Sequence, residues 1–566
     1  SEKINEAIDE LTKDRSSKSL YEANKEVHTL LKNGYWVEYV NADWSSETST
    51  IIFIDWSTPT NNSFHVQQQP VIQWKIYTKR PDVVCYVNGL PFVVIECKNS
   101  NQPVRKAYDD NITDYLEAIP QLFVYNQFVM LTNWSTTKLW AFTSSYEHYY
   151  TRQKIESEKE TANKSMKTAV HWVLDHEKIL DIVENFVLFD NHYNAKIVAK
   201  NHQYLWVNNV YENFLDRWTL DGKLWVYRHT QWSGKSYSMM FVVQKILRQA
   251  KGNYTFVIVT DRKELDSQIA KWFTTCWVVN DADARADSIA DLKKLLSQDR
   301  RVIFTLIHKF DETFAELNQR DDIIVMTDEA HRSQYGDLAM WMRKALPKAN
   351  FLWFTWTPLI QEDVEATRDV FGKYVSVYNF SQSIQDGATV PIYYENYTPK
   401  VVNENPDLAK ELEALQEKFT NKDDDDVVNN KISLAYAILT RDDVLDEIAK
   451  HIAHHYVARW EWSNGKAMVV AIDKLTAVKM YWKVKNAFES IRWAGNAPEM
   501  AVMISLWDKQ AEDRKMADSW WDFSILRNKI IEKDVKLTVK FKKIVIKTVD
   551  RFGNIFYTTI FRIWSI

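Results

Sequence analysis

Glycine is scarce in this sequence: there are 11 among 566 residues, where average usage of about 7% predicts roughly 40. Tryptophan, which is normally rare, occurs 24 times. Several tryptophans, including Trp36, Trp232 and Trp356, occupy positions where the backbone geometry favours glycine. We therefore hypothesise that many of them stand where the natural protein has glycine, which the absorbance of the protein at 280 nm would test.

Cysteines are few and long apolar runs are missing. The three cysteines, Cys85, Cys97 and Cys276, have neither metal-ligand spacing nor an even number, which argues against a zinc site and a disulfide framework. No run of eighteen apolar residues occurs and the polar start lacks a signal-peptide core, so we expect a soluble intracellular protein with no membrane partner. With a net charge of −5, a nucleic acid would need a locally basic channel.

A predicted hairpin in the first third of the chain gathers charged side chains. Two β-rich runs, Val83–Val87 and Phe92–Cys97, are joined by Asn88-Gly89, a strong hairpin signal. This hairpin would place Asp82 opposite residues 95 to 97 and beside Glu96, with Lys98 on the same face as Glu96. Asp82 and Glu96 could hold Mg²⁺, and Lys98 could orient or activate a water that attacks a phosphodiester. The alternative is an exposed salt-bridge cluster.

Further elements are predicted around this hairpin. Helices are expected over Leu20–Lys32 and over Val104–Ile119, the latter ended by Pro120. Strands are expected over Thr50–Asp55 and Leu122–Leu131.

The middle of the chain contains a candidate phosphate-binding loop, Arg228–Ser236. It lies between an apolar run, Leu224–Tyr227, and a predicted helix, Tyr237–Arg248. In such a loop the backbone N–H groups and the helix start would cradle phosphates, with Gly234 giving close approach, Lys235 reaching the outer phosphates and Ser236 binding Mg²⁺. Two residues do not fit the general pattern, since His229 stands where glycine is expected and Trp232 is bulky. By itself the short match also suits an ordinary helix start.

Alternating strands and helices after about residue 190 predict a parallel α/β sheet. Strands are expected over Tyr254–Thr260, Arg301–Thr305 and Ile323–Thr327. The last would deliver Asp328 and Glu329 to the carboxyl edge of the sheet, where Asp328 would hold nucleotide-bound Mg²⁺ and Glu329 would position the hydrolytic water. An incidental acidic turn is the alternative. A further strand from Phe351 would end in Thr355 and Thr357, close to the γ-phosphate, or would simply be a strand terminus.

The last third of the chain is less clearly patterned. A charged linker, Glu404–Asn430, precedes two predicted strands, Lys466–Ile472 and Met500–Ser505, that alternate with helices and suggest a second α/β lobe. No segment resembles the arginine-containing motif that such a lobe normally contributes to the nucleotide, so the second lobe looks incomplete.

Together these motifs resemble one family, the restriction (motor and nuclease) subunit of type I restriction–modification enzymes. The match runs from about residue 20 to 510. In that family His229 is ordinary, glycine stands where Trp232 and Trp356 do, and glutamine usually stands where Asn111 does, four residues before Tyr115. The segments that carry the resemblance are Arg80–Lys98, His229–Ser236, Thr260–Arg262, Asp328–Gln334, Thr355–Pro358 and Asp386–Ile392.

The resemblance implies a fold, a set of sites and a set of partners. The fold would be an N-terminal PD-(D/E)xK endonuclease domain (1–185) followed by two RecA-like superfamily 2 motor lobes (186–395 and 396–566, the second incomplete). The activity would be ATP- and Mg²⁺-dependent translocation of double-stranded DNA with cutting at remote sites. The partners would be modification (methyltransferase) and specificity subunits in the prokaryotic cytoplasm. The expected nucleotide-binding residues also include Gln203, which would read adenine or else be a solvated glutamine, and Thr230, Ser233 and His331.

Two other classes of function stay open on the sequence. The chain could be a DNA motor that does not cut, whose nuclease fold only grips the duplex. It could also be a non-catalytic nucleic-acid-binding scaffold if the indole of Trp232 obstructs phosphate.

Overall fold

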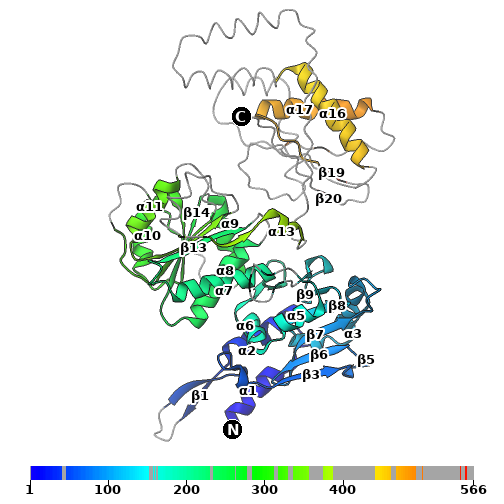
Figure 1. Ribbon diagram of the computed structural model, residues 1–566, viewed down its shortest axis with the longest axis vertical. Coiled ribbons are helices and arrows are strands. Elements are labelled where there is room, and N and C mark those ends of the chain that lie inside the picture. The colour runs from blue at the N-terminus through cyan, green and yellow to red at the C-terminus, as the bar shows by residue number, and fades with distance from the viewer. Residues whose placement is uncertain are drawn as a thin grey trace, which may run out of the picture. The chain divides into compact units, whose positions relative to one another are not determined.

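The chain divides into two compact units, residues 1–392 and 393–566. In the computed structural model the first unit contains two six-stranded sheets (Figure 1). The residues that the structure describes are 2–40, 46–151, 154, 157, 160, 163–229, 234–261, 263–276, 284–310, 316–328, 335–355, 372, 374–385, 440–460, 467–491, 500, 502, 548–549 and 555–556.

The N-terminal sheet has the strand order β10-β9-β8-β7-β6-β3, in which β7 and β8 are parallel and the other pairs antiparallel. Its strands are β3 (Phe64–Gln68), β6 (Val83–Val87), β7 (Leu90–Cys97), β8 (Phe128–Thr132), β9 (Thr137–Trp140) and β10 (Tyr150–Thr151). The accompanying elements are α1 (Glu2–Thr12), α2 (Leu20–Asn33), the ribbon β1 (Tyr35–Val40) and β2 (Ser46–Ile51), η1 (Pro59–Asn61), the hairpin β4 (Ile72–Trp74) and β5 (Tyr77–Lys79), η2 (Ala107–Ile112), α3 (Thr113–Ala118), α4 (Gln121–Val124) and η3 (Tyr146–His148).

Local signals explain where these elements begin and end. Helix α2 starts at a capping box, in which Ser19 and Glu22 satisfy each other's backbone N–H groups. The predicted hairpin of β6 and β7 is confirmed, with Asn88 at φ 50° and Gly89 at φ 81°. These left-handed residues are what a two-residue hairpin turn requires. Helix α2 confirms the predicted helix, and η2 with α3 covers most of the second one.

Two strand predictions in this region were partly wrong. The expected strand at Thr50–Asp55 ends at Ile51, because the Asp55 carboxylate accepts hydrogen bonds from the backbone N–H groups of Ser57 and Thr58 and closes a turn. In the expected strand at residues 122–131, α4 precedes β8. A proline at the start of α4 is compatible with a helical first turn, which apolar composition alone did not distinguish from a strand.

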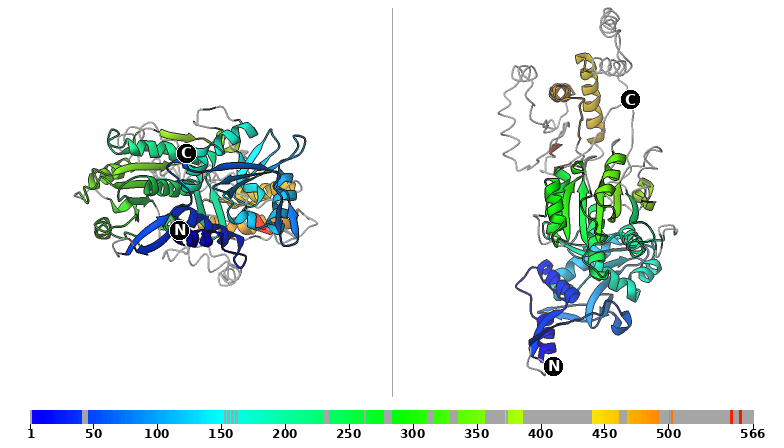
Figure 2. Two further views of the ribbon diagram at one scale, coloured as in Figure 1. Left: turned by 90° about the horizontal axis from the view of Figure 1, so that it is seen from below. Right: turned by 90° about the vertical axis from the view of Figure 1, so that its left-hand side faces the viewer.

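The second sheet is parallel throughout, in the order β15-β14-β16-β17-β13-β18, and confirms the predicted α/β arrangement. Its strands are β13 (Lys223–His229), β14 (Thr255–Thr260), β15 (Val302–Leu306), β16 (Ile323–Asp328), β17 (Asn350–Thr355) and β18 (Tyr374–Tyr378). Helices cover it on both faces (Figure 2). The helices here are α7 (Asn201–Leu215), α8 (Lys235–Gln249), α9 (Lys263–Thr275), α10 (Ile289–Leu296), η4 (Ile307–Lys309), α11 (Tyr335–Ala345) and α13 (Phe380–Gln385).

One continuous hydrophobic core joins the two sheets of the first unit. It includes Phe92 and Phe128 of the N-terminal sheet and Phe241 and Phe256 of the second region. The connecting elements are α5 (Met166–Val173), α6 (His176–Asn185) and the hairpin β11 (Val187–Asp190) and β12 (Ala195–Val198).

A fully buried lysine, Lys196, ties this connecting hairpin to the N-terminal sheet. Its ammonium donates to Asn24 Oδ1 at 3.0 Å, to the Asn126 carbonyl at 2.8 Å and to Gln127 Oε1 at 3.1 Å. Burial holds the pKa of Lys196 well below its ordinary value. The three acceptors compensate the loss of water around the amine.

The second unit is described mainly by two packed helices, α16 (Asp442–Trp460) and α17 (Lys474–Ser490), with a two-stranded ribbon, β19 (Thr548–Val549) and β20 (Ile555–Phe556). The prediction of a strand at Lys466–Ile472 was wrong, since residues 467–472 form no strand. Val469 within this segment is nevertheless buried. Asp473 caps α17 by accepting from the Thr476 N–H. Most of the expected second lobe lies outside the described residues.

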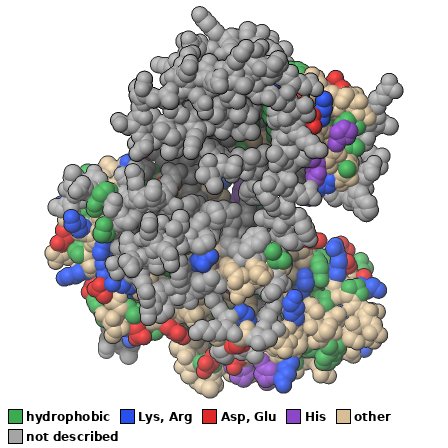
Figure 3. Space-filling view, turned by 45° about the horizontal axis from the view of Figure 1, so that its top comes forward, with side chains coloured by type: hydrophobic (Ala, Val, Ile, Leu, Met, Phe, Trp, Pro, Cys, Tyr) green, Lys and Arg blue, Asp and Glu red, His purple; other side chains and the backbone are tan. Residues whose placement is uncertain are grey.

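None of the described helices is both long and apolar enough to cross a bilayer. Where Figure 3 draws described residues, basic and acidic side chains are intermingled.

Candidate functional site

The β6–β7 hairpin brings Asp82 and Glu96 into contact. Val83 pairs with Ile95, so that Asp82 follows opposite Glu96. The backbone N–H of Asp82 donates to Glu96 Oε1 at 3.0 Å, and the N–H of Cys97 donates to Asp82 Oδ2 at 2.8 Å. The structure therefore places the two predicted carboxylates together at the end of the hairpin.

Glu96 is fully buried, and its environment is unusual for a carboxylate. Its Oε2 atom is buried with no hydrogen-bond partner among the described residues. Burial raises the pKa of Glu96 to about 8; the negative charge of Asp82 adds to this, while the hydrogen bond from the Asp82 backbone opposes it. A buried carboxylate oxygen without a donor is costly unless it is protonated or bound to a cation.

The donor set suits a hard cation with few protein ligands. No group of three or more His, Cys, Asp or Glu in the described part of the chain is arranged to hold a metal. Mg²⁺, however, is commonly held by one or two carboxylates and completes its shell with water and substrate phosphates. The orphaned oxygen of Glu96 beside Asp82 fits this pattern.

Lys98 is held beside the carboxylates by a chain of polar side chains. Its ammonium donates to Asn111 Oδ1 at 2.5 Å, Asn111 Nδ2 donates to the Tyr115 hydroxyl at 3.3 Å, and that hydroxyl donates to the Arg80 carbonyl at 3.3 Å. Asn111 lies in the π-helical turn η2, a distortion that often occurs at functional sites. Asparagine at this position, although shorter than glutamine, therefore reaches Lys98.

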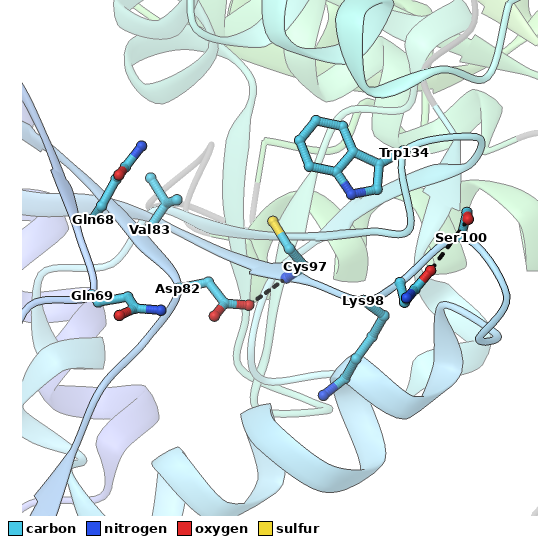
Figure 4. A pocket seen from close by; sticks show the side chains of 9 residues that line it. Gln68, Gln69, Asp82, Val83, Cys97, Lys98, Ser100 and Trp134 are labelled. Carbon is cyan, nitrogen blue, oxygen red and sulfur yellow. Dashed lines mark hydrogen bonds between the residues drawn. The ribbon is translucent and has the colours of Figure 1, made fainter.

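Asp82 and Lys98 border a cleft of about 840 Å³ (Figure 4). Sequence reasoning named Asp82 and Lys98 here but missed Gln68, Gln69 and Trp134. The two glutamines could have been noticed because they lie shortly before the Arg80-Pro81-Asp82 motif. The lining residues are Gln68, Gln69, Asp82, Val83, Cys97, Lys98, Asn99, Ser100 and Trp134.

The candidate phosphate loop leads into helix α8 as predicted. Gly234 caps the helix at φ 87°, and a β-carbon there would lie 2.7 Å from Gln203 Nε2, so only glycine fits without a shift. Lys235 Nζ lies 3.7 Å from Asp328 Oδ1. Asp328 ends β16, so the two predicted phosphate and Mg²⁺ residues meet at the carboxyl edge of the sheet.

Gln203 is buried against the phosphate loop. Its Nε2 donates to the Gly234 carbonyl at 2.9 Å and to Ser238 Oγ at 3.2 Å, while its Oε1 accepts from the Lys200 N–H at 2.8 Å. It is therefore not a solvated glutamine, and in this structure both ends of its amide are engaged by the protein.

The remaining residues that the sequence singled out fall into two groups. Thr355 ends β17 and Ser236 lies in the first turn of α8. The following predicted residues lie outside the described part of the chain: Thr230, Trp232, Ser233, Glu329, His331, Trp356 and Thr357.

Two protein-family models match the chain. Residues 1–148 match the N terminus of the type I restriction enzyme R protein, and residues 202–425 match the SWI2/SNF2 ATPase. The first model covers β3 to β9 and the hairpin beside Asp82, and the second covers the parallel sheet and helix α8, which begins at Lys235.

Curated relatives align with most of the chain. It is 31% identical over 551 residues to the type I restriction enzyme HindI endonuclease subunit of Haemophilus influenzae, covering 88% of this chain and 51% of that protein. It is 30% identical over 518 residues to a putative type I restriction enzyme MjaIXP endonuclease subunit of Methanocaldococcus jannaschii, covering 84% and 48%. The chain thus spans about half the length of these relatives.

Among solved structures, a fragment of a putative HsdR subunit of a type I restriction enzyme from Vibrio vulnificus is similar to this chain. The identity is 17%, the coverage is 75% of this chain and 70% of that one, and the TM-score is 0.31. Because the family model covers the N-terminal region and the curated relatives extend over both sheets, the chain is a homologue of type I restriction enzyme endonuclease subunits over most of its length.

Proposed function

We propose that this chain is the ATP-dependent DNA translocase and Mg²⁺-dependent endonuclease of a type I restriction–modification complex. The observation that carries the proposal is the contact between Asp82 and Glu96, with Glu96 Oε2 buried and unpaired among the described residues. Double-stranded DNA would be the substrate. Modification and specificity subunits in a prokaryotic cytoplasm would be the partners.

In the nuclease site, Asp82 and Glu96 would hold Mg²⁺, and the bound ion would polarise a DNA phosphate and acidify its bound water. Lys98 would orient the attacking water, since its ammonium is fixed by Asn111 beside the carboxylates. The water oxygen would bond to phosphorus as the bond to one bridging oxygen breaks. Asp82 is held for this role by the Cys97 N–H, so its carboxylate keeps one orientation.

In the nucleotide site, Lys235 would bind the outer phosphates of ATP and Asp328 the nucleotide-bound Mg²⁺. Their separation of 3.7 Å supports this assignment, because it brings the two side chains to one point at the carboxyl edge of the sheet, where one could contact the phosphates and the other the cation. Glu329 would position the hydrolytic water. Gln203, Thr230, Ser233, Gly234, Ser236, His331, Thr355 and Thr357 would complete the nucleotide site, with Gln203 supporting the loop through Gly234.

Two substitutions separate the motor from the nuclease. With linear and circular DNA, ATP and Mg²⁺, Lys235→Ala should abolish ATP hydrolysis, translocation and cutting, whereas Asp82→Ala should abolish cutting alone. Lys251→Ala, in an exposed lysine just after α8, and Asp114→Asn, in a half-exposed carboxylate of α3 that is paired with Lys79, are the matched controls. Undiminished cutting by Asp82→Ala would show that this site does not cut DNA, and would favour a DNA motor whose nuclease fold only grips the duplex. Absence of DNA-stimulated ATP hydrolysis by the unaltered chain would favour a scaffold.

A further inference from the structure

Gln69 occupies an unusual backbone position at the rim of the nuclease cleft. It follows the last residue of β3, and its φ of 46° lies in the left-handed region that residues other than glycine seldom adopt. The following residue is Pro70, which normally favours extended backbone before it. The backbone N–H of Gln69 donates to the carbonyl of Asp82 at 2.9 Å. This hydrogen bond holds the left-handed backbone of Gln69 against the predicted metal-binding residue.

The Gln69 side chain faces the catalytic groups. It is exposed and lines the cleft with Asp82 and Lys98. In Figure 4 it points toward the Asp82 carboxylate, whereas the neighbouring Gln68 points away. Lys98 follows the other strand of the site and its side chain is seen on the opposite side of Asp82. Backbone strain of this kind is often retained where it aims a side chain at a functional site.

We infer that the Gln69 carboxamide is a substrate-binding residue of the nuclease site, which donates a hydrogen bond to a phosphate oxygen of the DNA strand held over Asp82. This inference rests on the proposed nuclease function and adds a residue to it. A phosphate in the cleft must approach two carboxylates that repel it. A neutral amide supplies N–H donors without adding another charge, and phosphate oxygens accept such bonds from glutamine in many DNA complexes.

Because the backbone at Gln69 is left-handed, the side chain can be removed by a substitution that should not disturb the fold. Gln69→Gly removes the carboxamide and places at this position the residue that tolerates φ of 46° best. The fold should therefore be retained, with a urea midpoint equal to or above that of the unaltered protein. Gln69→Glu keeps the size but replaces the donor by a negatively charged acceptor. Gln68→Ala is the control, because Gln68 lines the same cleft and points away from Asp82.

The assay is single-turnover cutting of circular DNA by the full chain assembled with its modification and specificity subunits, as a function of DNA and Mg²⁺ concentration. Gln69→Gly should lower the cutting rate or the apparent DNA affinity by about 10- to 100-fold, the loss expected for a hydrogen bond to a charged group. Gln69→Glu should lower it at least as far. Both variants should hydrolyse ATP at the unaltered rate, and Gln68→Ala should cut within about twofold of the unaltered complex.

Cutting by Gln69→Gly at the unaltered rate would overturn the inference. So would full activity of Gln69→Glu at a lower Mg²⁺ concentration, because that result would make the side chain a metal ligand and not a donor. These outcomes differ from failure of the proposed function itself, which would show as normal cutting by Asp82→Ala and would remove both proposals together.

Discussion

Mg²⁺ binding to the nuclease site should release a proton, because the Glu96 carboxyl group is protonated at neutral pH in the metal-free protein. Its pKa is raised to about 8, chiefly by burial. A carboxylate must lose its proton to bind a metal. Below pH 8 the apparent Mg²⁺ affinity should therefore fall roughly tenfold for each pH unit, and at pH 6 it should be about 100-fold weaker than its limit at high pH.

The same pKa sets the sign of the pH dependence of stability. Because the folded-state pKa lies above the ordinary value of 4.5, the metal-free folded protein binds this proton more tightly than the unfolded chain does. The contribution of Glu96 is fully present below about pH 4.5 and is lost as pH rises toward 8, by at most about 1.4 kcal/mol per pH unit. Saturating Mg²⁺ should oppose that loss, since it binds the deprotonated folded form.

Calorimetric Mg²⁺ titrations of the full chain at pH 6, 7 and 8, each in two buffers with different ionisation enthalpies, would count the protons released. We expect close to one proton per bound ion at pH 6 and about half of one at pH 8. Glu96→Gln should abolish both the release and the pH dependence, while Glu147→Gln, in an exposed carboxylate, should change neither. A Mg²⁺ affinity that is flat from pH 6 to 8, without proton release, would refute the reasoning.

Two further predictions concern stability measured by urea denaturation. Trp134→Gly should raise the free energy of unfolding by about 1 kcal/mol, because Trp134 is 61% exposed and has φ 73°; a clear decrease would show that its indole packs productively. Lys196→Met should lower the free energy of unfolding by about 2–4 kcal/mol, because it removes three buried hydrogen bonds and takes from Asn24 Oδ1 the donor that Lys196 supplies. Lys167→Met, at an exposed lysine, should change it by less than about 0.5 kcal/mol.

The strands of the parallel sheet were predictable because each is a short apolar run with a clear boundary. The runs that end at Thr260 and Asp328 form β14 and β16 as expected. The prediction failed where a side chain redirects the backbone, as the Asp55 carboxylate does when it closes a turn on Ser57 and Thr58. Such a local hydrogen bond competes with strand formation, and apolar periodicity does not reveal it.

Site residues that belong to a short sequence motif were predictable, whereas residues that only the tertiary fold brings to the site were not. Asp82, Glu96 and Lys235 stand in short recognisable patterns, and the structure brings each beside a predicted partner. Gln69 belongs to no such pattern. Its place at the cleft follows from the pairing of β3 with β6, which joins residues far apart in the sequence. The pKa of Glu96 likewise depends on packing that no local pattern encodes.

The contact between Asp82 and Glu96 depends on a β-bulge in the hairpin. Around the two-residue turn Val87 pairs with Leu90 and Tyr86 with Pro91, but Cys85 pairs with Val93, so Phe92 is the extra residue. Without that residue in the bulge, continued pairing would place Asp82 opposite residue 95 and turn Glu96 to the other face of the sheet.

The carbonyl of the bulged Phe92 is satisfied by the Gln127 N–H at 2.7 Å and by Asn126 Nδ2 at 3.1 Å. Asn126 and Gln127 also accept hydrogen bonds from Lys196. The polar contacts that stabilise the bulge are therefore shared with the buried lysine of the connecting hairpin. It follows that the geometry of the two carboxylates is fixed by residues that touch neither of them, which is why the turn and the bulge belong to the site as much as its charged side chains do.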